Sequence, residues 1–245
     1  MRVTTPAYVL RRVRWSESSL ILTLYSLDLG RISVMAKGAL RPKGRFYGAL
    51  ELLSLAEVTL SRREGREIDT LTEASVIRGN EGLRSDPLAF GHACLLAEWV
   101  LGLVWGSEPS QPVFHLMDRS LAMLADGADG WPVVCAAVER LLRLSGFGME
   151  VDRCVSCGGP AGNGWRPESG GLVCAACGGG KGVPAGFLSW VRRARRTGLP
   201  ELARIRLWSG GFRQCHDIMR GFAEAQLGSR LRLRSLSVLE DLENG

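Results

Sequence analysis

The first 80 residues alternate between apolar and polar positions over short stretches. In "LAEVTL" (55–60), three apolar side chains alternate with Glu57 and Thr59. A period of two predicts a β-strand with one buried face. Similar stretches, rich in β-forming residues and bounded by turn signals such as "LDLG", bring the total to five. The predicted strands cover residues 7–15, 20–25, 31–37, 55–60 and 69–77.

Five short strands in so short a segment leave no room for long helical crossovers. Such a pattern favours a small antiparallel barrel over a parallel sheet. An OB-type barrel is the fold we expect, with an SH3-like barrel as its rival. Residues 1–80 are therefore predicted to form an OB-fold nucleic-acid-binding domain.

Helical signals begin near Ser85, where "SDP" places capping residues before Pro87 at a first helical position. An apolar run follows to Trp105, and Pro112 and Pro132 open two further helical patterns. Helices are also predicted at 184–196, 212–226 and 235–242. The chain is thus expected to be an α+β protein, with a helical domain over residues 81–245.

Four of the seven cysteines lie in "CVSCGGPAGNGWRPESGGLVCAAC", as two C-x2-C pairs separated by 16 residues. This spacing is typical of a four-cysteine zinc site. Four thiolates leave no open coordination position, so the expected zinc is structural, not catalytic. A thioredoxin-like couple or disulfides fit this glycine-rich loop less well. We predict a zinc module at about residues 150–180, inserted into the helical domain, with ligands Cys154, Cys157, Cys174 and Cys177.

The charge distribution indicates where a polyanion would bind. The net charge is +6, from 31 basic and 25 acidic residues. Residues 1–80 carry 13 basic and 8 acidic side chains, residues 81–150 carry 4 and 9, and residues 151–245 carry 14 and 8. Two basic ends therefore flank an acidic middle, and a polyanion is expected at the ends. With no secretory signal and no apolar run of about 18 residues, the expected location is cytoplasmic.

The segment "GRISVMAKGALRPKGRFYGAL" (30–50) is the first candidate nucleic-acid site. It holds five cations and no acid, and two aromatic residues sit beside them. Phosphate-neutralising charge next to stacking faces is typical of single-strand binders. A soluble loop whose aromatic rings turn inward is the alternative. The candidate contacts are Arg31, Lys37, Arg41, Lys43, Arg45, Phe46 and Tyr47.

A second basic cluster, "RRARR", lies at residues 192–196. Its cations span more than one helical face, so a solvated surface is the simplest interpretation. We nevertheless predict that it extends the nucleic-acid path, through Arg192, Arg193, Arg195 and Arg196.

An enzyme finds little support in the sequence. "GGGKG" (178–182) lacks the Ser or Thr and the glycine spacing of a phosphate loop. The histidines His92, His115 and His216 are scattered, without metal-type partners. We therefore predict a non-enzymatic binding protein.

The N-terminal stretch "YVLRRVRWSESSLILTLYSLDLGRISVMAKGALRPKGRFYGALELLSLAEVTL" resembles the OB domain of the bacterial RecO family, most specifically in "AKGALRPKGRF". "LLRLSGFGMEVDRCVSCG" is similar to that family's junction between helical domain and zinc module. The resemblance covers nearly the whole chain in the same order. It implies a DNA repair and recombination mediator that binds single- and double-stranded DNA and anneals complementary strands.

The resemblance also implies partners and site residues. The family engages the C-terminal tail of single-strand-binding protein (SSB) and acts with RecR to place RecA on coated DNA, which implies a nucleoid-associated location. Lys37 matches the family's basic DNA-binding position, and the four cysteines match the zinc ligands of members that have them. Composition alone leaves open an OB-fold and zinc-containing RNA-binding or regulatory module.

Overall fold

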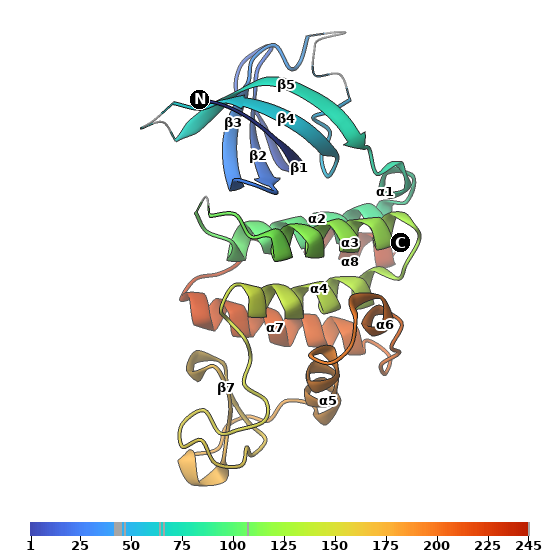
Figure 1. Ribbon diagram of the computed structural model, residues 1–245. Helices are drawn as coiled ribbons and strands as arrows, with labels where there is room; N and C mark the ends of the chain where they lie inside the picture. The colour runs from blue at the N-terminus through green and yellow to red at the C-terminus, as the bar shows by residue number, and fades with distance from the viewer. Residues whose placement is uncertain (42–45, 47, 64, 66, 107, 245) are drawn as a thin grey trace.

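The N-terminal residues form a closed five-stranded barrel in the computed structural model, which describes residues 1–41, 46, 48–63, 65, 67–106 and 108–244. The strands are β1 (Arg2–Arg14), β2 (Leu20–Ser26), β3 (Gly30–Ala36), β4 (Leu55–Ser61) and β5 (Ile68–Arg78). Their order is β1-β2-β3-β5-β4, and β4 closes on β1 (Figure 1). Among these five strands, β3 and β5 pair in parallel and the other neighbours are antiparallel. This is the OB-like barrel that the alternation predicts.

The barrel interior is apolar, as the period of two requires. Its core is closed by side chains from all five strands, among them Val9, Leu22, Leu24, Val34, Val58, Leu60 and Leu71. The strand β1 begins at Arg2, five residues earlier than the sequence indicates, because its first half pairs with β4 from Arg2–Ser61 to Tyr8–Leu55.

Below the barrel lies a stack of helices, and a small two-stranded module lies at the far end (Figure 1). The helices are α1 (Glu81–Ser85), α2 (Pro87–Leu103), α3 (Gln111–Ala125), α4 (Gly130–Leu144), α5 (Ala185–Ala194), α6 (Leu199–Ala203), α7 (Gly211–Leu227) and α8 (Ser235–Asn244). The cap predicted for α2 is present, since the Asp86 carboxylate accepts the N–H groups of Leu88 and Ala89 at 2.9 and 3.2 Å. The five-stranded barrel and the helices that follow it confirm the predicted α+β fold.

The module consists of β6 (Gly164–Arg166) and β7 (Gly171–Val173), each followed by a single 3-10 turn. It connects α4 to α5, while α4 packs directly on α6 and α7, which come after it in the chain. The module is therefore an insertion between helices that share one core. Within the described residues, no helix is long and apolar enough to cross a membrane.

A polar network joins the barrel to the helices. The Tyr8 hydroxyl donates to Asp118 on α3 at 2.6 Å, and Arg78 at the end of β5 donates to both of these residues. The Tyr8 ring packs on Phe114, with ring centroids 5.6 Å apart. Burial raises the pKa of Tyr8, and the Asp118 carboxylate raises it further. The Tyr8 phenol therefore stays protonated and keeps its bond to Asp118.

Replacing Asp118 by alanine is expected to weaken this junction. The variant leaves the Tyr8 hydroxyl and the Arg78 guanidinium without their shared acceptor, at a cost of about 1 to 2 kcal/mol in the free energy of unfolding. Urea denaturation measures the cost. Asp118→Asn keeps an acceptor and should recover part of it. A stability equal to that of the unmodified protein in both variants would contradict a structural role for the network.

Candidate nucleic-acid interface and metal centre

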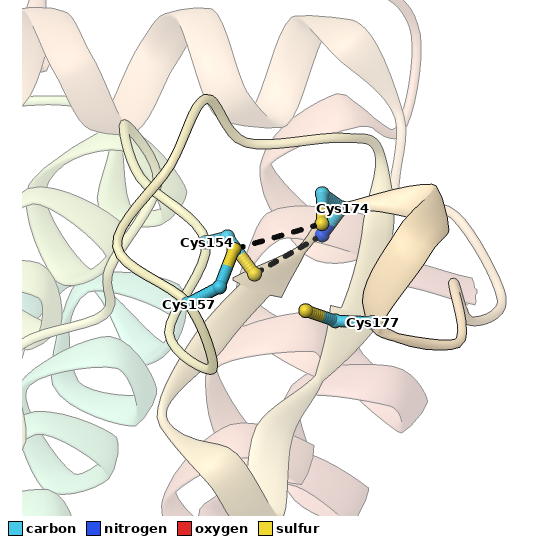
Figure 2. Close-up of side chains that lie close together, drawn as sticks. All are labelled: Cys154, Cys157, Cys174 and Cys177. Carbon is cyan, nitrogen blue, oxygen red and sulfur yellow. Dashed lines mark hydrogen bonds between the residues drawn. The ribbon is translucent and has the colours of Figure 1, made fainter.

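Four cysteine side chains converge in the inserted module (Figure 2). Their sulfur atoms all lie within 4.8 Å of one another, and the Sγ atoms of Cys157 and Cys174 are 3.8 Å apart. Four sulfurs placed about 2.3 Å from a central tetrahedral ion would be about 3.8 Å apart. The spacing in the structure therefore fits one metal ion held by all four predicted ligands.

The local sequence explains this convergence. Each C-x2-C pair closes a tight turn, and the glycine after it, Gly158 or Gly178, has a positive φ of 73° or 98°. A side chain at either glycine would be strained in this left-handed region. The Gly158 N–H bonds to the Cys154 carbonyl at 2.8 Å, which folds the first pair back on itself. The strands β6 and β7 carry the second pair next to the first.

The chemistry of the donors also fits a divalent cation. Backbone N–H groups of Cys174 and Cys157 lower the pKa of Cys154 to about 6, because they stabilise its thiolate. Hydrogen bonds with the other cysteines, Cys174 foremost, raise the pKa of Cys177 to about 12. A metal ion at their centre supplies the charge that allows all four to act as thiolates.

The module is fixed to the helices by aromatic packing. The Trp165 ring on β6 lies 5.6 Å from that of Phe222 on α7 and 6.0 Å from that of Phe187 on α5, between ring centroids. The Gln226 side chain donates to the Pro167 carbonyl at 2.5 Å. Trp165 therefore serves the docking of the module.

The second basic cluster lies where the module meets α5. The Asp152 carboxylate accepts from Arg192 at 2.9 Å and from Arg195 at 3.0 Å. Arg192 also donates to the Val151 carbonyl at 2.5 Å, and Arg195 to the carbonyl of Met149. These two arginines tie α5 to the entrance of the module.

The other two members of that cluster, Arg193 and Arg196, are exposed. Arg193 lines a shallow groove of about 330 Å³ with the aromatic residues Trp190 and Trp208. The cluster is thus divided: two cations have structural partners and two face solvent.

The first two cations of the predicted basic loop after β3 are described and exposed. Lys37 follows β3 directly, and Arg41 comes four residues later. Lys43, Arg45 and Tyr47 lie outside the described residues, and their contacts stay predictions. The described residues place these two cations at the barrel end that is farthest from the helices, because β3 runs away from Gly30, whose backbone approaches Glu108 before α3.

Two other predicted contacts are placed differently. Phe46 is only 3% exposed and packs in the barrel core, which corrects the expectation that its ring is open to a base. The Arg31 guanidinium donates to the carbonyls of Leu101 and Val104 at 2.8 and 3.3 Å, so it caps the end of α2. The sequence analysis left open that the loop aromatics turn inward, and for Phe46 they do.

The structure adds two candidate residues that the sequence analysis missed, Arg14 at the end of β1 and Trp15 in the turn that follows it. Trp15 is 66% exposed. The turn lies against the start of the basic loop, because the Leu40 N–H bonds to the Ser18 carbonyl at 3.0 Å. In OB folds this turn and the face of strands 2 and 3 commonly bind oligonucleotides. The sequence signal that could have found them is an aromatic residue next to a cation at the end of the predicted strand 7–15.

We call Arg14, Trp15, Lys37 and Arg41 together the barrel interface. All four side chains are exposed at the same end of the barrel, and no ion pair engages any of the three cations within the part of the chain that the structure describes. Cations can neutralise phosphates while the ring stacks on a base. The arrangement is therefore suited to a single nucleic-acid strand.

Comparisons with known proteins agree with this architecture. The family model "Recombination protein O N terminal" matches residues 1–80, and "Recombination protein O C terminal" matches residues 84–235. The chain is 33% identical over 243 residues to the DNA repair protein RecO of Anaeromyxobacter dehalogenans, covering 95% of this chain and 94% of that protein.

Two further relatives are similar over a shorter stretch. The DNA repair protein RecO of Rhodopirellula baltica is 36% identical over 176 residues, which cover 70% of this chain and 65% of the relative. That of Rubrobacter xylanophilus is 35% identical over 173 residues, which cover 69% and 68%. Two successive family models match the chain, and one relative is matched along almost its whole length. The chain therefore belongs to the RecO family of DNA repair proteins.

Proposed function

We propose that the protein is a non-enzymatic recombination mediator that binds single- and double-stranded DNA and anneals complementary strands. In this proposal it acts with RecR to load RecA onto DNA coated by SSB, whose C-terminal tail it engages. The single observation that carries the proposal is the barrel interface, where Trp15 is exposed on an OB-like barrel together with three cations that form no ion pair with any described residue. The expected location is the cytoplasm, in association with the nucleoid.

The barrel interface supports this function by two physical effects. Lys37 and Arg41 neutralise phosphates and release counterions, which gives affinity without sequence preference. Trp15 offers a face on which any base can stack. A mediator must act on any damaged sequence, so contacts that ignore base identity suit the task.

We propose that the ion in the module is Zn²⁺ and that its role is structural. The observed donors are four cysteine sulfurs at tetrahedral spacing, the set that zinc favours in structural sites. Bound there, zinc supplies a cross-link between the two C-x2-C turns. Trp165 and Gln226 then fix the cross-linked module to the helices.

The proposal predicts that this protein accelerates the annealing of complementary strands that are each pre-coated with the cognate SSB. The acceleration should disappear when SSB lacks its C-terminal tail. A fluorescence-quenching assay with labelled strands measures the rate.

The control is a competition between matched DNA and RNA strands for the bare protein. A folded, metal-loaded preparation that binds bare strands but leaves annealing unchanged would contradict the mediator function. A preference for RNA in the same preparation would instead favour an RNA-binding or regulatory module.

A further inference from the structure

The segment that connects α7 to α8 carries three arginines in a regular pattern. Arg230, Arg232 and Arg234 are exposed, whereas Leu231 and Leu233 between them are half-buried against the helices. The exposure alternates along the segment, so the three cations face solvent while the two leucines pack on the helices. We call Arg230, Arg232 and Arg234 the arginine strip.

The strip is held in place by its backbone and by its leucines. The Leu231 N–H bonds to the Glu224 carboxylate at 3.1 Å, and the Ser235 N–H bonds to the Glu98 carboxylate at 3.0 Å. The Leu231 side chain lies so close to Gly102 on α2 that a Cβ there would be 2.7 Å from it. The segment is therefore pinned between α2 and α7.

Those two carboxylates do not remove the charge of the strip. Each accepts from a backbone N–H. Burial raises the pKa of Glu98, an effect that its hydrogen bonds with Ser235 and, to a smaller degree, the charge of Arg234 offset only in part. No ion pair engages any of the three guanidinium groups among the residues that the structure describes. Arg192, Arg195 and Arg213, by contrast, are all paired with carboxylates.

The exposed charge of the strip suits a nucleic-acid backbone. Three guanidinium groups face solvent within five residues of chain. A DNA strand carries one phosphate per nucleotide, so these groups can contact more than one phosphate of the same strand.

The strip is separate from the barrel interface. It runs along the helical stack, between α7 and α8 (Figure 1). Lys37 lies at the opposite end of β3 from Gly30, where the barrel meets the helices. Seven residues of β3 place the two ends about 20 Å apart. One short oligonucleotide on the barrel interface would therefore not need the strip.

We propose that the arginine strip is a second DNA-binding site, which holds the phosphates of a second strand while the barrel interface holds the first. The inference rests on the proposed function, since annealing requires two polyanions to be brought together by one protein. Cations on two separate surfaces reduce the repulsion between the strands and leave the bases of each free to search for pairs.

The test uses the full-length, metal-loaded protein with Arg230→Gln, Arg232→Gln and Arg234→Gln combined. Annealing of bare complementary strands should slow by about tenfold or more, because the second strand loses its site. Binding of one oligonucleotide of about ten nucleotides, which a single OB fold can cover, should change less than twofold. On a long strand, the log-log salt slope should fall by about two units, at about 0.7 per lost phosphate contact.

A matched control combines Arg84→Gln, Arg119→Gln and Arg153→Gln, which removes the same net charge from three exposed, dispersed positions. Equal annealing rates in the two triple variants would overturn the inference, because the effect would then follow from net charge alone. A loss of short-oligonucleotide binding in the strip variant with an unchanged melting temperature would also overturn it. If the unmodified protein itself fails to anneal strands, it is the proposed function that fails.

Discussion

Replacing Cys154 and Cys157 by serine is expected to unfold the inserted module and to abolish metal binding. These residues supply two of the four sulfurs that lie within 4.8 Å of one another. A structural zinc contributes about 10 to 16 kcal/mol to the folding of small zinc-binding peptides at neutral pH. Here the module has only two three-residue strands and a few contacts with the helices to replace that contribution.

The free energy of unfolding should fall by more than about 4 kcal/mol, in the range that loss of a structural metal can reach. Metal content by mass spectrometry, thermal unfolding and limited proteolysis between α4 and α5 measure the outcome. Cys94→Ala is the control, because this thiol lies on α2 outside the cluster and should leave metal content unchanged. A folded double-serine variant that keeps its stability but loses DNA binding would contradict a structural role.

The elements that the sequence predicted well depend on local patterns. A period of two is visible within six residues, and the C-x2-C spacing is a property of the chain itself. The five-residue helices α1 and α6 were missed, because a single turn and a half shows no clear periodicity. The early start of β1 was missed because it is set by pairing with β4, more than 50 residues away.

The residues of the candidate site also divide into those that a local motif predicts and those whose contacts depend on the fold. The spacing of the four cysteines predicted their convergence, whereas the DNA-binding role that the motif gives Lys37 stays a prediction. Arg192 and Arg195 pair with Asp152, which lies 40 and 43 residues away in the chain. This pairing depends on how the module folds back on α5. Trp15 was overlooked for a similar reason, since only the folded barrel brings its turn against the basic loop.

The barrel interface yields a prediction that separates charge from stacking. Lys37→Gln with Arg41→Gln removes two exposed cations and should reduce the magnitude of the log-log salt slope for single strands by roughly one to two units. Trp15→Ala should instead weaken binding by about 1 to 3 kcal/mol at every salt concentration and leave the slope unchanged, because stacking releases no counterions. Fluorescence anisotropy with a short labelled oligonucleotide, repeated over a salt series, measures both quantities.

The chain offers matched controls for each change. Arg84→Gln with Arg119→Gln removes the same charge from the helical region, and Trp105→Ala removes an indole of equal exposure. Both controls should bind the short oligonucleotide as the unmodified protein does. If the control charges change the slope as much as Lys37 and Arg41 do, the interface is not on the barrel. If Trp15→Ala changes the slope but not the affinity at low salt, Trp15 does not stack on a base, and the turn between β1 and β2 only positions the neighbouring cations.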